Sequence, residues 1–182
     1  MPRGGPGPAG PPHSWACRLL RMAAMPAHDV QDRIAAWRVL GVPLALPVVL
    51  AWAALHRRRV LRAGRPLTAE ECQLACAVGV ARPEQVRVLQ RPRGPWPLRW
   101  FGRRVDAVTV GHGVHAFGAA LTPGLLAHEL RHVQQVEAAG SLARFLFDYL
   151  QQVARHGYWR APLEVDAREA ARAYSEVAGR PS

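Results

Sequence analysis

The pattern of apolar and polar positions changes several times along the chain, and its first marked feature is a long apolar run. From Val39 to Leu55 there is no charged residue, a length just at the lower limit for crossing a bilayer. Pro43 and Pro47 would kink a soluble helix but are tolerated in membrane helices. We therefore expect a hydrophobic helix over residues 34–56 that spans a membrane through residues 39–55; the alternative is a helix that packs on the folded domain or on a partner.

The flanking charges suggest an orientation for this segment. Arg57, Arg58 and Arg59 follow the run directly and outweigh the basic residues before it. Because basic residues stay on the cytoplasmic side of a membrane helix, we expect an uncleaved anchor with the remainder of the chain in the cytoplasm. A soluble cytoplasmic protein is the alternative.

Shorter patterns follow, and most of them predict a small sheet. Thr68 can cap a helix that Gly79 ends. Residues 83–90, PEQVRVLQ, have the pattern of a strand, and residues 106–118, DAVTVGHGVHAFG, form two alternating segments around a Gly-His-Gly turn. We expect these strands to form a small antiparallel sheet.

The C-terminal third has the apolar spacing of helices. Thr122 and Pro123 form an N-cap and first-turn pair, and Gly140 can end the helix that they open. Ser141 opens a second helix, and a third begins near Pro162. The expected fold class is α+β, with the folded domain over residues 66–178.

Composition changes this picture little. Residues 1–30 are rich in Pro and Gly, so we expect them to be disordered. The formal charge of +11 comes with 24 basic residues that are all Arg and are scattered. No aromatic-interleaved basic motif accompanies them, so we expect no nucleic-acid partner.

The chemistry of the chain is concentrated in the segment LLAHELRHVQQ. It contains the pattern H-E-x-x-H, which places His128 and His132 four residues apart on one helix face, where both imidazoles can bind one zinc ion. Glu129 lies beside the first ligand, and its carboxylate can take a proton from a metal-bound water. We expect Zn²⁺ as cofactor and Glu129 as the catalytic base.

A catalytic zinc needs a third protein ligand. The third predicted helix offers Glu164, Asp166 and Glu169. We favour Glu164, because it falls in the rigid first turn after Pro162. Asp166 is the alternative ligand, or else an acid that orients one of the histidines.

Together the segments TPGLLAHELRHVQQ and YWRAPLEVDA resemble a minimal HExxH zinc metallopeptidase of the gluzincin type. The resemblance covers residues 67–174 and is closest to short bacterial domains found beside contractile injection and secretion loci. It implies zinc ligands at His128, His132 and Glu164, with Glu129 as general base. It further implies a zincin-like edge strand that pairs with an extended substrate, here over residues 114–118 and including the three positions His115, Ala116 and Phe117.

Two departures from this resemblance concern the site. Arg168 stands where many larger relatives have an acid that orients a histidine, which makes Asp166 the replacement. The residue that stabilises the oxyanion has three candidates: His112, His156 and Tyr158.

The function expected from the sequence is a membrane-anchored zinc metallopeptidase that acts on a peptide or protein substrate. Two alternatives remain open: a non-catalytic, zinc-stabilised module that binds peptides as a scaffold, and an effector-associated domain of a secretion system. The presence of Glu129 favours the enzyme, because holding a metal does not require that carboxylate.

Overall fold

The computed structural model describes residues 27–91, 106–117 and 121–178, and it describes side chains from residue 41 onward. The chain forms two compact units, Met1–Trp37 and Arg38–Ser182. In the first unit, the described residues 27–37 are helical. Residues 27–30, expected to be disordered, are therefore part of a helix, and the rest of the expected disordered segment lies outside the described residues. All that follows concerns the second unit.

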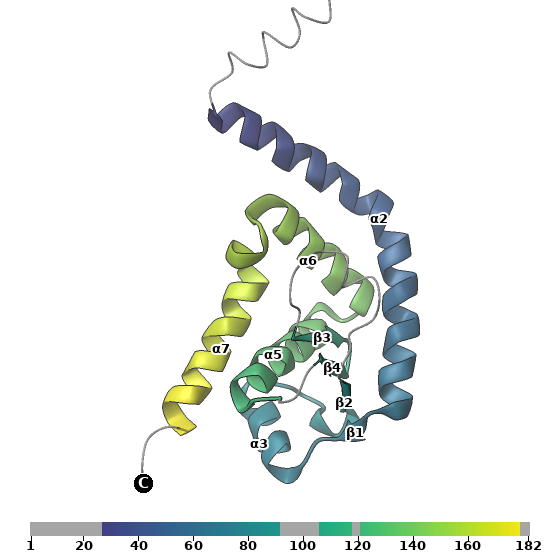
Figure 1. The fold of residues 1–182 in the computed structure, drawn as a ribbon, viewed down its shortest axis with the longest axis vertical. Helices are drawn as coiled ribbons and strands as arrows, with labels where there is room; N and C mark the ends of the chain where they lie inside the picture. Colours follow the sequence, from purple (N-terminus) through teal and green to yellow (C-terminus); the bar gives the residue numbers. More distant parts are fainter. Residues whose placement is uncertain (1–26, 92–105, 118–120, 179–182) are drawn as a thin grey trace, which may run out of the picture. The chain divides into compact units, whose positions relative to one another are not determined.

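The described residues form five α-helices and a four-stranded sheet (Figure 1). This confirms the expected combination of helices with a small sheet. The helices are α2 (Ala27–Ala63), α3 (Ala69–Ala77), α5 (Pro123–Ala139), α6 (Leu142–His156) and α7 (Pro162–Ala178). The strands are β1 (Arg65–Pro66), β2 (Arg87–Arg91), β3 (Ala107–Val110) and β4 (Gly113–Phe117), and two short 3-10 helices are η1 (Pro83–Gln85) and η2 (Tyr158–Arg160).

Local signals account for the helix boundaries. Thr68 accepts a hydrogen bond from the backbone of Glu71, and the Glu71 side chain bonds back to the Thr68 backbone, forming a capping box before α3. Thr122 and Ser141 cap α5 and α6 in the predicted positions. Gly140 ends α5 with a φ of 76°, a left-handed conformation that favours glycine.

The sheet differs from the prediction in its topology. Its order is β1-β2-β4-β3, with β2 and β4 parallel and the other two pairs antiparallel. The predicted purely antiparallel sheet is therefore wrong: β3 and β4 form the expected hairpin, but the hairpin joins β2 through β4. As a result β4 is a central strand, and the prediction that residues 114–118 form an edge strand is also wrong. The edge beside α5 is β3.

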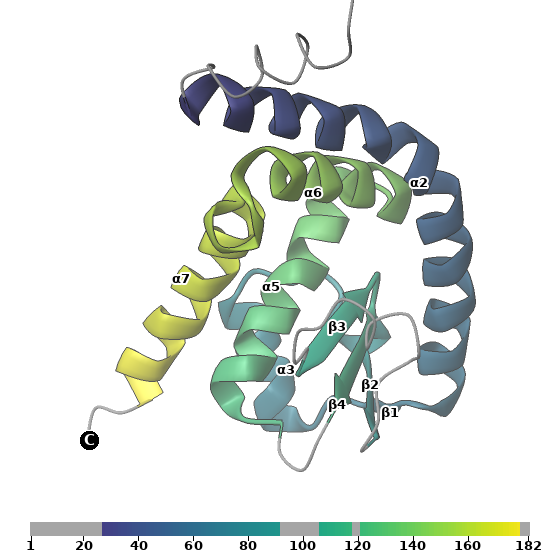
Figure 2. The ribbon, with the colours of Figure 1, turned by 45° about the horizontal axis from the view of Figure 1, so that its top comes forward.

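One face of the sheet packs against α5 and α3 (Figure 2). The strands contribute Val88 and Val114, and α5 contributes Leu130 and Val133, all four nearly inaccessible to solvent. Burying such side chains stabilises the fold by about 1.5–3 kcal/mol each. This core holds α5 in a fixed position under the sheet, and α5 carries the H-E-x-x-H motif.

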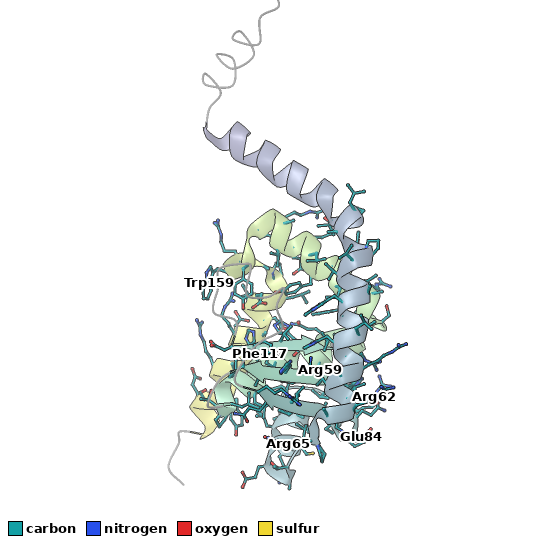
Figure 3. All side chains as sticks on the ribbon, turned by 45° about the vertical axis from the view of Figure 1, so that its right-hand side comes forward. Arg59, Arg62, Arg65, Glu84, Phe117 and Trp159 are labelled. Carbon is teal, nitrogen blue, oxygen red and sulfur yellow. The ribbon has the colours of Figure 1, made fainter. Side chains whose placement is uncertain are left out.

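The other face of the sheet packs against the second half of α2 (Figure 3). Ala53 and Val60 of α2 contact Leu89 and Val110 of the strands in a second, smaller apolar cluster. The approach is close: a Cβ atom added to Gly113 would lie 2.9 Å from Val60 Cγ1. Glycine is needed at this position for α2 to pack directly on β4.

The expected membrane-spanning helix is not supported. Within the part of the chain that the structure describes, no helix is long and apolar enough to cross a bilayer. Residues 39 and 40 of the predicted span lie outside the described side chains. The remainder belongs to α2, where Ala53 is fully buried in the packing against the sheet.

Candidate metal centre

Three side chains from two helices converge on one point. His128 and His132 project from α5, and Glu164 projects from the first turn of α7. The two Nε2 atoms lie 3.2 Å apart. Glu164 Oε2 lies 3.5 Å from His128 Nε2, and Glu164 Oε1 lies 3.5 Å from His132 Nε2. Glu164 is only 2% exposed and His132 only 6%. The three residues predicted as zinc ligands are therefore brought together.

These distances fit a zinc ion. Donor atoms about 2.0–2.1 Å from a tetrahedral zinc are about 3.3–3.4 Å from one another. The separation of 3.2 Å between the two Nε2 atoms and the distance of 3.5 Å from each Nε2 atom to its nearer Glu164 oxygen are close to that value. With one donor atom taken from each residue, all three atoms lie within 4.8 Å of one another. Two imidazoles and a carboxylate are also a donor set that zinc favours in catalytic sites. The residues present fit the metal that the motif implies.

The Glu164 carboxylate is held in place by Tyr149 of α6. The Tyr149 hydroxyl donates a 2.7 Å hydrogen bond to Glu164 Oε1, and Arg168 Nη1 lies 3.5 Å from Oε2. Burial opposes ionisation of Glu164, but the hydrogen bonds from His128, His132 and Tyr149 outweigh it and hold the pKa of this carboxyl far below its usual value. Glu164 therefore carries a negative charge.

His132 is oriented by a relay of polar side chains. Its Nδ1 lies 2.8 Å from Gln135 Oε1, and Gln135 Nε2 donates to Asp166 Oδ2 at 2.6 Å. An Nδ1–H that donates to Gln135 leaves the Nε2 lone pair free to face the other donors. Burial lowers the pKa of His132, but the hydrogen bond to Glu164 and the charge of Glu129 outweigh it, so the net shift is upward.

Asp166 does not take the role of ligand. It forms two hydrogen bonds with Arg131, at 2.8 and 2.9 Å, and receives the one from Gln135. The group of residues that could hold a metal ion comprises His128, His132 and Glu164 without Asp166. Asp166 does not contact His132 directly; the hydrogen bonds of Gln135 connect the two residues.

The candidate base, Glu129, is buried beside the edge strand. It is 5% exposed and accepts a 2.7 Å hydrogen bond at Oε2 from the hydroxyl of Thr109 in β3. The same hydroxyl lies 3.1 Å from the Glu129 carbonyl oxygen. Thr109 thus links β3 to α5 and fixes the orientation of the carboxylate.

Of the three oxyanion candidates, only Tyr158 lies at the donor cluster. Burial, the charge of Glu164 and a hydrogen bond with that carboxylate raise the pKa of Tyr158, with the charge of Glu129 adding to the effect. The next residue, Trp159, is 65% exposed on the outer surface of η2 (Figure 3). Arg168 stacks over its ring and donates to its backbone carbonyl, which fixes η2 on α7.

The other two candidates are placed elsewhere. His112 Nε2–H donates to Glu137 Oε1 at 2.9 Å, near the C-terminal end of α5, and Glu137 also accepts hydrogen bonds from the backbone N–H groups of Ala81 and Arg82. His112 is therefore part of a structural contact. His156 is exposed at the end of α6 and lines a cavity of about 260 Å³ that does not include the three donors.

The predicted substrate strand also faces elsewhere. His115 Nδ1 lies 2.9 Å from His56 Nε2 of α2, and the two rings stack between Trp52 and Phe117. His115 therefore points toward α2, on the face of the sheet opposite α5. Ala116, its neighbour in β4, is only 3% exposed. These residues cannot pair with a substrate at a sheet edge.

Sequence reasoning missed three residues of the site: Thr109, Gln135 and Tyr149. Gln135 lies three residues after His132, where a helix brings side chains together, so spacing alone could have indicated it. Tyr149 follows Phe145 by one turn on the buried side of α6, which resembles an ordinary core pattern.

Comparison with protein-family models, curated proteins and solved structures finds no match to this chain.

Proposed function

We propose that this chain is a zinc-dependent metallopeptidase that hydrolyses peptide bonds with a water molecule activated by Glu129. The proposal rests on the donor triangle of His128, His132 and Glu164. Its two Nε2 atoms are 3.2 Å apart and each lies 3.5 Å from one oxygen of the Glu164 carboxylate, an arrangement that suits zinc. Three protein ligands with an open fourth position are typical of catalytic zinc sites, whereas structural sites have four.

In this proposal the chain's own residues move the proton. A bound zinc ion supplies Lewis-acid chemistry, lowering the pKa of water and polarising a carbonyl oxygen. Glu129 accepts the proton of the attacking water and passes it to the leaving amine nitrogen. Thr109 donates to Glu129 Oε2, which leaves Oε1 to handle the proton.

Two tyrosines have separate tasks. Tyr149 holds Glu164 through the hydrogen bond to Oε1, so it positions a ligand and does not touch the substrate. Tyr158 has a protonated hydroxyl at neutral pH, because burial and the nearby carboxylates raise its pKa. A neutral phenol beside the donor cluster can donate a hydrogen bond to the oxygen that becomes negative during attack.

The open edge of β3 suits an extended peptide. The Phe117 N–H donates to the Asp106 carbonyl at 2.7 Å, so the alternation of an antiparallel pair directs the backbone groups of Ala107 and Thr109 away from β4. Among the described residues, no strand pairs with that side of β3. A substrate strand added there would run past Thr109 and the carboxylate it holds.

The decisive experiment compares the wild type with Glu129→Gln, using Glu169→Gln as the control because Glu169 is an exposed acid on α7. We expect one equivalent of zinc in all three proteins by elemental analysis. Cleavage of an unfolded protein substrate should fall at least a thousandfold in Glu129→Gln only, because a glutamine amide cannot accept the proton of the attacking water. Unchanged cleavage in Glu129→Gln, or no cleavage by the zinc-loaded wild type, would contradict the peptidase proposal and favour a peptide-binding scaffold.

A further inference from the structure

One face of α2 is buried between residues 42 and 60. Val42, Ala53, His56 and Val60 are between 0 and 7% exposed. Their spacing places them on one side of the helix, since successive residues turn by about 100°. The opposite side of α2 is therefore turned away from the folded domain.

That opposite side is also apolar. Leu44 is 83% exposed, Val48 is 73% exposed and Leu55 is 66% exposed, and Ala51 between them is exposed as well. Steps of four, three and four residues place all four on one narrow line along the helix. We call these four residues the α2 apolar stripe. Exposed Leu residues scattered singly are ordinary, but a continuous line of them marks an interaction surface.

Basic residues follow the α2 apolar stripe on the same side of the helix. Arg58 and Arg62 follow Leu55 at steps of three and four residues, on the same side of the helix, and both are exposed. Arg59 is exposed next to them, and Arg62 projects outward from α2 (Figure 3). Residues 41–63 contain no acidic side chain. The surface therefore combines an apolar stripe with a cluster of cations at its end.

We propose that this surface docks on an anionic membrane, with α2 lying in the plane of the interface. The apolar stripe enters the boundary between headgroups and acyl chains, and Arg58 and Arg62 bind lipid phosphates. A second copy of the chain fits less well: a parallel pairing of the stripes would bring the arginines of both copies together, and an antiparallel pairing would place Arg58 and Arg62 beside residues 41–48 of the other copy, which carry no acidic side chain. The chain's formal charge of +11 favours approach to the same anionic surface.

The experiment is sedimentation of the full chain with vesicles, which reads binding without using the metal site. We expect binding to vesicles of phosphatidylcholine and phosphatidylglycerol in equal parts, and at least tenfold weaker binding to phosphatidylcholine alone. The Arg58→Glu/Arg62→Glu variant should bind the anionic vesicles at least tenfold more weakly. The control Arg144→Glu/Arg172→Glu changes the charge equally at exposed positions of α6 and α7 and should bind as the wild type does.

A second variant tests the apolar contribution. Val48→Asn/Leu55→Asn should also weaken vesicle binding at least tenfold, while Phe147→Asn, at an exposed position of α6, should not. Two results would overturn the proposal: equal binding of all variants, or a dimer without lipid that Val48→Asn/Leu55→Asn converts to a monomer. Neither result depends on zinc or on peptidase activity, so the membrane proposal and the proposed function can fail separately.

Discussion

At the scale of single residues, Glu164 and Asp166 show how two acids on one helix acquire different partners. They are two positions apart on α7, so their side chains leave the helix in different directions. Glu164 is 2% exposed and faces the two histidines, whereas Asp166 is half-buried and pairs with Arg131. Position along the helix, and not residue type, separates the candidate ligand from the acid that supports it.

A matched pair of variants tests this distinction. We expect Glu164→Gln to lose the zinc equivalent, because a neutral amide is a poor zinc ligand in place of a buried carboxylate. Asp166→Asn should keep the zinc and lower the free energy of unfolding by about 1 kcal/mol, through the weakened pair with Arg131. Elemental analysis and urea unfolding give the two quantities; zinc lost from Asp166→Asn and kept by Glu164→Gln would reverse the assignment.

The two tyrosines at the site give a second residue-scale prediction. Tyr149→Phe removes the hydrogen bond that orients Glu164, so zinc affinity should fall by about tenfold to a hundredfold. Tyr158 also bonds to Glu164, so the two variants are compared at saturating zinc, where Tyr158→Phe should reduce kcat by on the order of a hundredfold through loss of the donor to the oxyanion and Tyr149→Phe should not. Competition with a zinc chelator and steady-state kinetics separate these effects. An unchanged kcat of Tyr158→Phe at saturating zinc would give Tyr158 only a positioning role.

At the scale of elements, α2 is joined to the sheet by an unusual pair of buried histidines. His115 of β4 contacts His56 of α2, and its Nε2 has no hydrogen-bond partner among the described residues. Burial and the positive charges of Arg59 and Arg91, together with His56, lower the pKa of His115 from 6.5 to about 4. Burial and Arg59 also lower the pKa of His56. Both imidazoles are neutral in the folded chain at neutral pH.

This pair predicts a pH dependence of stability. Between pH 6.5 and about 4 the imidazole of His115 binds a proton in the unfolded chain but not in the folded chain. The free energy of unfolding is therefore unaffected by this group above pH 6.5 and decreases as the pH falls toward 4. Over this pH range the free energy of unfolding of His115→Gln should decrease by on the order of 2 kcal/mol less than that of the wild type. Urea unfolding at several pH values checks the difference, with the exposed His156→Gln as control. Equal pH slopes for the wild type and His115→Gln would contradict the prediction.

The elements also show what the sequence could predict. Caps such as Thr122 and Gly140 are local signals, so the boundaries of α5 were predictable. Strand order is not local: a hairpin with apolar residues on both faces can join β2 through either of its strands. The apolar run of α2 suits a bilayer and the face of a sheet equally well, which is why it predicted a membrane span.

At the scale of the whole molecule, the candidate site is predictable from the sequence only where local spacing defines it. His128, Glu129 and His132 are defined by spacing within one helix, and Glu164 by its place after Pro162. The remaining contacts join distant parts of the chain, as Thr109 joins β3 to α5 and Tyr149 joins α6 to α7. Such contacts depend on tertiary packing that residue patterns do not encode, so His112 and His115 were assigned to the site although they lie elsewhere.

The donor triangle also joins helices that are separate in sequence, which leads to a prediction for the stability of the molecule. The candidate ligands come from α5 and α7, and without an ion a buried carboxylate faces two imidazoles. Zinc that binds only the folded chain stabilises it by about 2.7 kcal/mol at a free concentration one hundred times the Kd. For a chain of this size that is a rise in Tm of roughly 5–10 °C. Calorimetry with and without a chelator should show this rise for the wild type and not for Glu164→Gln; an equal rise in both would mean that zinc binds somewhere other than the donor triangle.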